Sequence, residues 1–149
     1  MKRRDIDAVM VAWEVLTRGG TLSDPRFVIG DPAAMRWQME GWFEKFFPFP
    51  PSLLAEVDGE VVGWISGGPS KGSPMLIAPK TAKIGNLWVD PEHRRQGIAA
   101  ELVRTWTERA TAAGYPRIEV GTLALDERAV AFWKSQGFGD WRVTFHRGE

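Results

Sequence analysis

Residues Leu87 to Leu102 read Leu-Trp-Val-Asp-Pro-Glu-His-Arg-Arg-Gln-Gly-Ile-Ala-Ala-Glu-Leu, and this stretch decides the fold. An apolar strand end meets Asp90-Pro91, which cannot continue a central strand because proline has no backbone N–H. An amphipathic helix follows from Gly97. A glycine-bearing turn at a helix start leaves backbone N–H groups without partners, and the helix dipole adds positive potential there. The stretch therefore predicts a strand-turn-helix connection with an anion site, most naturally for a phosphate group.

Two neighbouring arginines at this turn, Arg94 and Arg95, favour the phosphate interpretation. The alternative is an ordinary connection whose arginines are solvated. Other phosphate-binding loops fit poorly, because the chain has no Gly-x-x-x-x-Gly-Lys-Ser/Thr and no Gly-x-Gly-x-x-Gly after a strand.

A second segment, Asp-Glu-Arg-Ala-Val-Ala-Phe-Trp-Lys-Ser-Gln-Gly-Phe, occupies residues 126–138. Asp126 is a good N-cap and Gly137 a good C-terminal stop, so the segment predicts a short helix. Its apolar face is formed by Ala129, Phe132 and Trp133.

Composition narrows the class of protein. The 149 residues are typical of one domain, expected over residues 1–149, and Lys plus Arg equals Asp plus Glu at 19 each. A balanced charge argues against nucleic acid or an anionic membrane as a partner. With no cysteine and two histidines, we expect neither a disulfide nor a metal site. No apolar run of membrane-spanning length and no signal-peptide pattern occurs, so we expect a soluble cytoplasmic protein.

Periodicity and turn residues predict the remaining elements. We expect a helix from Asp5 to a stop at Gly19-Gly20 and further helices over residues 32–46, 97–113 and 126–136. Strands are expected over residues 53–57, 60–66, 83–89, 117–123 and 141–146. The first two strands flank the tight-turn pair Asp58-Gly59, residues 47–51 read as extended, and residues 67–80 read as a loop. This order predicts an α/β (α+β) fold with a mixed, mostly antiparallel sheet and helices on both faces.

Both segments resemble signatures of the GNAT acyltransferases. Arg94-x-x-Gly97-x-Ala99 matches Gln/Arg-x-x-Gly-x-Gly/Ala, which holds the pyrophosphate of acetyl-coenzyme A in that family. Four residues match the family's last element, Asn-x-x-Ala-x-x-Phe/Leu-Tyr-x-x-x-Gly-Phe: Ala129, Phe132, Gly137 and Phe138. The two segments occur in the family's order, and the resemblance covers about residues 53–145.

The resemblance implies a single GNAT-like domain whose middle strands, residues 83–89 and 117–123, splay apart to admit the pantetheine arm of acetyl-CoA. The family usually opens with a strand, which this chain lacks or keeps very short, because a helical pattern starts by Ile6. The edge over residues 53–57 would then be exposed, and pairing in a homodimer would cover it. The implied cofactor-binding residues are Leu87, Trp88, Val89, Arg94, Arg95, Gln96, Gly97, Ile98, Ala99, Asp126, Ala129, Phe132 and Trp133.

The resemblance also implies direct acetyl transfer to an amine, without a side-chain nucleophile, with the Val89 backbone N–H pointing at the thioester carbonyl. The family's tyrosine that protonates the leaving thiolate is Trp133 here, and an indole is not an acid near neutral pH. Protonation by solvent or another group is therefore expected. The family's asparagine is Asp126, which we interpret as a helix cap. Three groups remain open for the acceptor proton: Glu119 as a base, Asn86 as a water positioner, and His146.

The sequence thus predicts an acetyl-CoA-dependent N-acetyltransferase whose acceptor is an amine on a small molecule or a protein. Two alternatives remain. One is a non-catalytic module of the same fold that keeps the CoA site, and the other is an oligomerising structural domain without a cofactor. Binding of CoA separates the structural domain from the other two, and turnover separates those two.

Overall fold

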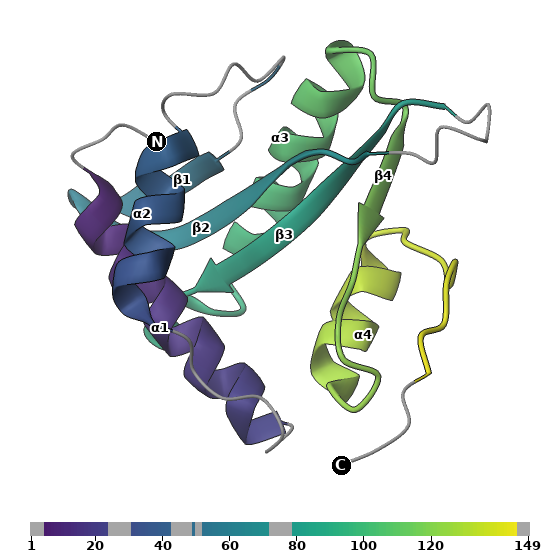
Figure 1. Ribbon diagram of the computed structural model, residues 1–149. Coiled ribbons are helices and arrows are strands. Elements are labelled where there is room, and N and C mark those ends of the chain that lie inside the picture. Colours follow the sequence, from purple (N-terminus) through teal and green to yellow (C-terminus); the bar gives the residue numbers. More distant parts are fainter. Residues whose placement is uncertain (1–4, 24–30, 43–48, 50–51, 72–78, 146–149) are drawn as a thin grey trace.

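The computed structural model describes residues 5–23, 31–42, 49, 52–71 and 79–145 of the chain (Figure 1). Within these residues four strands form one sheet in sequence order: β1 (Ser52–Val57), β2 (Glu60–Pro69), β3 (Thr81–Val89) and β4 (Arg117–Val120). The first three strands are antiparallel, and β4 is parallel to β3. The predicted mixed, mostly antiparallel sheet is confirmed.

The turn between β1 and β2 forms where the sequence predicts it. Asp58 has φ 52° and Gly59 has φ 86°, and both values lie in the left-handed region that a two-residue hairpin turn of type I′ requires. The turn fixes the register that pairs Leu54 with Trp64, and a bulge follows Ala55.

Helices cover both faces of the sheet, as predicted. Figure 1 shows α1 (Ile6–Ser23) and α2 (Pro32–Trp42) on one side and α3 (Ile98–Ala112) on the other. Under α1 and α2 the buried side chains are Val9, Ala12, Met39, Trp64 and Trp88. Under α3 the core includes Ile65, Ile84, Leu102, Trp106 and, from α4 (Glu127–Ser135), Trp133.

Strand β2 extends to Pro69, so the loop predicted from residue 67 begins too early. The register shifts after Ser66, and Gly67 then pairs with Ile84. A Cβ atom at Gly67 would lie 2.3 Å from the Lys83 carbonyl oxygen and 2.6 Å from the Trp106 ring. This glycine permits a close packing of strand and helix, and it does not mark a loop.

Helix α1 runs through the two glycines that were expected to stop it and ends at Ser23. Glycine weakens a helix by only about 1 kcal/mol relative to alanine, so it does not by itself end one. Helix α2 begins as predicted, because the Asp31 Oδ1 atom accepts the Ala33 N–H at 2.9 Å and proline occupies the first helical position. The rest of the predicted helix, residues 43–46, lies outside the described residues, as does the predicted extended segment apart from the buried Phe49.

Two predicted strands differ from the structure. The strand expected over residues 117–123 ends at Val120. The strand expected over residues 141–146 is wrong, because residues 141–145 join no sheet; His146 lies outside the described residues. The side chains of Trp141, Val143 and Phe145 alternate as in a strand, yet they are 67–89% exposed.

The described part of the chain opens with α1, and β1 forms an edge of the sheet. No strand among the described residues pairs with the outer side of β1, while residues 1–4 lie outside the description. None of the described helices combines the length and the apolar character needed to cross a bilayer.

Candidate active site

The two parallel strands in the middle of the fold separate halfway along β3. Their pairing runs from Thr81 opposite Arg117 to Ile84 opposite Val120, where β4 ends. Strand β3 continues to Val89 without a strand on that side in the described structure, and Figure 1 shows the two strands diverging. An extended amide-bearing group could add to this free backbone edge.

The ladder on the other side of β3 shows which N–H groups face this opening. The Asp90 N–H donates to the Val62 carbonyl oxygen at 2.9 Å. Opposed pairs in an antiparallel ladder alternate between exchanging two hydrogen bonds and exchanging none. Asp90 and Val62 therefore form a hydrogen-bonded pair, and the neighbouring pair of Val89 and Gly63 does not. The N–H groups of Val89 and, two residues earlier, Leu87 therefore point away from β2 and into the opening.

A short 3-10 helix, η2 (Pro91–His93), forms the first part of the turn after β3. Asp90 caps it by accepting the Glu92 N–H at 2.8 Å. The Arg94 Nε atom then donates to the Val89 carbonyl oxygen at 3.1 Å, which ties the turn back to the strand end.

The second part of the turn has a sharply curved backbone. Arg95 has φ 62° and Gly97 has φ 82°, so two of three consecutive residues are left-handed. A non-glycine residue in that region is uncommon and is held there by its surroundings. Such curvature makes backbone N–H groups converge, as in anion-binding nests.

The helix that follows supplies further donors. Gly97 is the N-cap of α3 and makes no side-chain cap bond, and the first helical bond runs from the Glu101 N–H to the Gly97 carbonyl oxygen at 3.0 Å. The N–H groups of Ile98, Ala99 and Ala100 therefore have no intrahelical acceptor. With the positive end of the helix dipole, these donors could bind an anion at the end of the β3–β4 opening.

Helix α4 begins as predicted, because the Asp126 Oδ1 atom accepts the Ala129 N–H at 3.0 Å. The Asp126 carboxylate thus acts as a helix cap. Trp133 is only 9% exposed and stacks edge-to-face on Phe132 and Phe138, with ring centroids 5.2 and 5.3 Å apart. The structure gives Trp133 a core position, and the cofactor contacts of this helix stay predictions.

The structure does not place Glu119 or Asn86, two proton acceptors proposed from the sequence, beside the Val89 N–H. Glu119 lies opposite Lys83, and from Lys83 to Val89 the strand rises about 20 Å. The Glu119 Oε1 atom instead accepts the Arg117 Nε–H at 3.1 Å. Asn86 alternates with Val89 and so faces the other side of the sheet, where its Nδ2 atom donates to the buried Ser66 Oγ at 3.0 Å.

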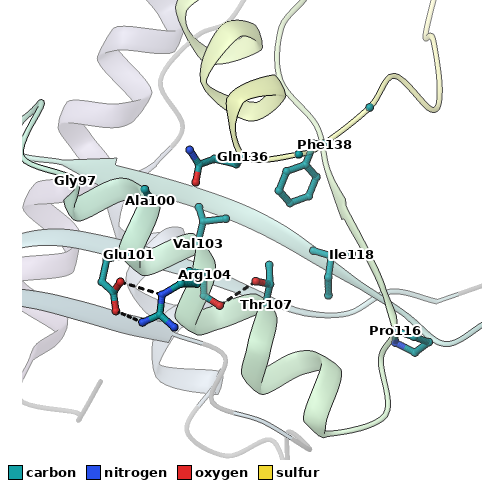
Figure 2. Close-up of a pocket in the computed structure, with 12 residues that line it drawn as sticks. Gly97, Ala100, Glu101, Val103, Arg104, Thr107, Pro116, Ile118, Gln136 and Phe138 are labelled. Atoms are coloured by element: carbon teal, nitrogen blue, oxygen red, sulfur yellow. Dashed lines mark hydrogen bonds and ion pairs between the residues drawn. The ribbon is translucent and has the colours of Figure 1, made fainter.

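A cavity of about 690 Å³ begins at the turn and follows α3 (Figure 2). It is lined by Gly97, Ala100, Glu101, Val103, Arg104, Thr107, Pro116, Ile118 and residues 136–139. A second cavity of about 580 Å³ lies between β1 and the other flank of α3. Sequence reasoning did not single out Glu101 and Arg104, two charged residues three apart that line the first cavity.

Residues 20–138 match the family model described as acetyltransferase (GNAT) family. The turn after β3, the uncapped start of α3 and the separation of β3 from β4 agree with this match. The chain belongs to the GNAT acetyltransferase family. The GNAT match includes both segments that carried the resemblance in the sequence.

Curated relatives support the GNAT assignment. Human N-acetyltransferase 8 is 39% identical over 85 residues, which cover 57% of this chain and 37% of that protein. Rat N-acetyltransferase family 8 member 3 is 35% identical over 95 residues, which cover 62% of this chain and 41% of that protein. The aligned region thus spans about two fifths of the length of these relatives.

Solved structures share the fold of this GNAT chain. The aminoglycoside N-acetyltransferase AAC(6′)-Iy in complex with CoA superposes with a TM-score of 0.79 at 17% identity, over 99% of this chain and 91% of that one. A tetramutant of the BH1408 protein from Bacillus halodurans also gives a TM-score of 0.79 at 17% identity, over 100% of this chain and 97% of that one.

In the described residues, no group of three or more His, Asp or Glu side chains is arranged to hold a metal ion.

Proposed function

We propose that this protein transfers the acetyl group of acetyl-CoA directly to an amine. The observation that carries the proposal is the junction of the β3–β4 opening with the uncapped start of α3, which joins a free strand edge to an anion site. A cofactor with an amide-bearing arm and a pyrophosphate fits those two features in that order. Family membership supports the same reaction.

In this proposal the backbone from Arg94 to Ala99 binds the pyrophosphate, and the free edge of β3 binds the pantetheine amides. The Val89 N–H donates a hydrogen bond to the thioester carbonyl oxygen, where negative charge develops as the amine nitrogen attacks the carbonyl carbon. The C–N bond forms, the C–S bond breaks and the sulfur leaves as a thiolate. Solvent removes the ammonium proton. Solvent also protonates the sulfur, because Trp133 cannot serve as an acid.

Thermal unfolding with and without acetyl-CoA tests the cofactor site. A ligand that binds only the folded state raises the free energy of unfolding by about 2.7 kcal/mol at one hundred times its dissociation constant, and the melting temperature keeps rising with the logarithm of the ligand concentration. No shift at millimolar acetyl-CoA would contradict the proposal.

Turnover is measured by thiol release with a panel of primary amines that includes aminoglycosides and lysine peptides. Aminoglycosides belong in the panel because a solved structure of similar fold is an aminoglycoside acetyltransferase in complex with sisomicin. Acetylation of any amine supports the enzyme. A thermal shift without turnover on any member would favour the non-catalytic CoA-binding module.

We also propose that the outer edge of β1, with which no described strand pairs, pairs with the same edge of a second copy in a homodimer. Sedimentation equilibrium tests this, and a monomer at tens of micromolar would contradict it. A cytoplasmic location, expected from the sequence, stays a prediction.

A further inference from the structure

The second cavity, of about 580 Å³, is a groove between β1 and α3. It borders the outer edge of β1, with which no described strand pairs. The apolar side chains of the groove are Leu53, Leu54, Ala55, Ile98 and Leu102, and the polar ones are Gln96, Glu101, Thr105 and Arg109. An apolar groove beside an unpaired strand edge has the form of a surface that another chain covers.

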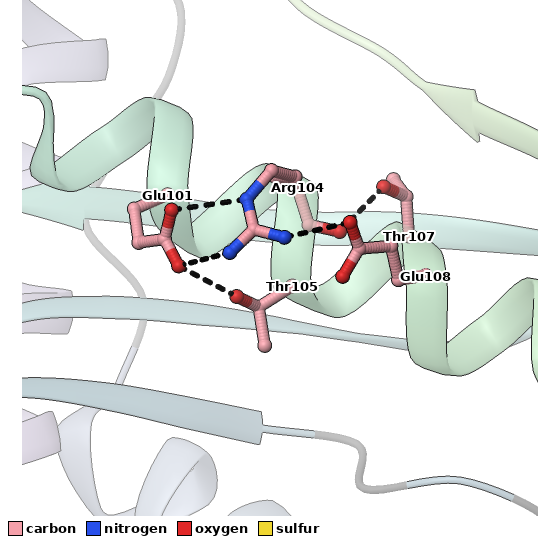
Figure 3. A network of polar contacts seen from close by, with 5 residues as sticks. All are labelled: Glu101, Arg104, Thr105, Thr107 and Glu108. Carbon is pink, nitrogen blue, oxygen red and sulfur yellow. Dashed lines mark hydrogen bonds and ion pairs between the residues drawn. The ribbon is translucent and has the colours of Figure 1, made fainter.

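Arg109 is the unpaired cation of this groove. Its side chain is exposed, and it joins no ion pair in the part of the chain that the structure describes. Arg104, the other arginine of α3, instead donates to both Glu101 and Glu108 (Figure 3). The opposite end of the groove is formed by Gly97 and its neighbours at the anion site. A cation and an anion site therefore lie at the two ends of one groove.

Helix α3 runs antiparallel to β1, and its height relative to the strand follows from two glycines of β2. A Cβ atom at Gly63 would lie 3.1 Å from the Leu102 side chain and 3.2 Å from that of Ala55. A Cβ atom at Gly67, just past the start of β1, would lie 2.6 Å from the Trp106 ring. Residue numbers along α3 thus rise as those along β1 fall, and Leu102 lies level with the middle of β1.

Pairing of two identical β1 edges places the two copies of α3 in a defined relation. A two-fold axis that pairs the edges in antiparallel fashion stands perpendicular to the joined sheet, so both helices lie on the same face and run antiparallel. An axis at the middle of β1 passes near Leu102. Arg109, seven residues after Leu102, then lies level with Arg95, seven residues before it, in the other copy. Arg109 of the partner subunit therefore reaches the turn that ends at Gly97.

The spacing between the two helices suits a long side chain. Helix α3 lies over β2, because a Cβ atom at Gly63 would be 3.0 Å from the Ile98 side chain. In the joined sheet, β2 and its copy are three strand spacings apart, which is about 14 Å. Helices in direct contact are about 8–10 Å apart, so the wider gap is spanned by β1 side chains below and by an arginine across it.

We propose that this groove docks a second copy of the chain and that Arg109 of the partner subunit adds a cation to the phosphate turn; this inference rests on the proposed function and its homodimer. Without an anion, the partner's Arg109 faces Arg94 and Arg95, which repel it. A bound pyrophosphate lies among these cations and replaces repulsion with attraction. Cofactor binding and dimerisation therefore favour each other, and by linkage each strengthens the other by the same factor.

Sedimentation equilibrium with and without saturating acetyl-CoA tests the coupling in the wild-type protein, Arg109→Gln and Arg128→Gln. Arg128 is the matched control, because it is exposed on α4 and joins no ion pair among the described residues. We expect acetyl-CoA to tighten the dimer about tenfold in the wild-type protein and in Arg128→Gln, but not in Arg109→Gln. High salt should weaken the coupling of the wild-type protein.

Thr105→Arg tests the docking itself. Thr105 lines the groove, so a long charged side chain there should block the second copy and leave the protein monomeric. The melting temperature of the variant without ligand shows that it is folded.

Three results would overturn the inference and leave the proposed reaction and homodimer intact: a wild-type dimer that acetyl-CoA does not tighten, coupling that survives in Arg109→Gln, or an unchanged dimer in Thr105→Arg. A wild-type protein that binds acetyl-CoA and stays monomeric would overturn the homodimer as well. Failure of the wild-type protein to bind acetyl-CoA would overturn the proposed function too.

Discussion

The Arg94 Nε atom donates to the Val89 carbonyl oxygen at 3.1 Å, so the side chain that opens the turn is bonded to the last residue of β3. The N–H of the same Val89 residue lies on this side of the strand, away from β2, and faces the β3–β4 opening. A single hydrogen bond therefore couples the proposed phosphate turn to the proposed oxyanion donor.

Removal of this bond should weaken cofactor binding. We expect Arg94→Ala to raise the dissociation constant for acetyl-CoA about tenfold, because a buried carbonyl loses a charged donor and the turn loses its anchor. Arg94→Lys keeps the charge but has no Nε–H, so it should restore little of the affinity. Calorimetry on both variants checks this, and full affinity in Arg94→Lys would show that charge alone is needed.

Gly97 tests the anion site itself. A Cβ atom there meets nothing within 4 Å, so Gly97→Glu should fold, with a strain of about 1–2 kcal/mol from its positive φ. Its carboxylate should abolish CoA binding in the thermal-shift assay. Gly114→Glu is the matched control, because φ is 87° and the space is also open, but the residue follows the other end of α3. Unchanged affinity in Gly97→Glu would remove the pyrophosphate assignment.

Local chemistry explains why the turn could be predicted from the sequence. Each signal in the turn depends only on residues close in sequence. Proline after Asp90 favours a helix start, Gly97 permits the positive φ before α3, and the apolar face of α3 predicts the helix. The cap at Asp126 could be predicted for the same reason.

Contacts between distant segments explain what could not be predicted. Glu119 was a candidate base because of its strand, but the register that sets it opposite Lys83 depends on how β3 and β4 pair. The alternation of Trp141, Val143 and Phe145 is typical of a strand, yet a strand also requires a neighbouring edge. Trp141 instead stacks on the Arg117 guanidinium, 3.8 Å from the ring centroid.

The packing of β2 against α3 depends on Gly67. Gly67→Ala should lower the free energy of unfolding by about 1–3 kcal/mol, because its Cβ would overlap a backbone oxygen and the Trp106 ring. Gly85→Ala is the control, since an added Cβ there would lie 3.7 Å from the Ser66 carbonyl oxygen, an ordinary van der Waals contact. Chemical denaturation measures both, and equal stability of the two variants would contradict the packing argument.

The ion pairs of α3 make a prediction about pH. Hydrogen bonds from Arg104 lower the pKa of Glu101, so the ionised carboxylate contributes stability above its unfolded pKa, and this is lost as pH falls through the lower folded pKa. The group is exposed, so the effect is small and weakens with salt. Carbon-13 NMR titration should show the Glu101 pKa rising in Arg104→Gln; an unchanged pKa would mean that the pairing does not persist in solution.

The resemblance in sequence places Trp133 at the position of the family's tyrosine, and the structure buries it in the core. A variant at this position can therefore separate a packing role from a role in acid catalysis. Trp133→Phe should lower the free energy of unfolding by about 1–3 kcal/mol, because the smaller ring leaves space between Phe132 and Phe138. The pH dependence of kcat should not change, since an indole does not titrate near neutral pH. Trp106→Phe, in the same core cluster, is the control for lost packing. A limb of the pH profile that disappears in Trp133→Phe but stays in Trp106→Phe would show that protonation of the thiolate passes through position 133.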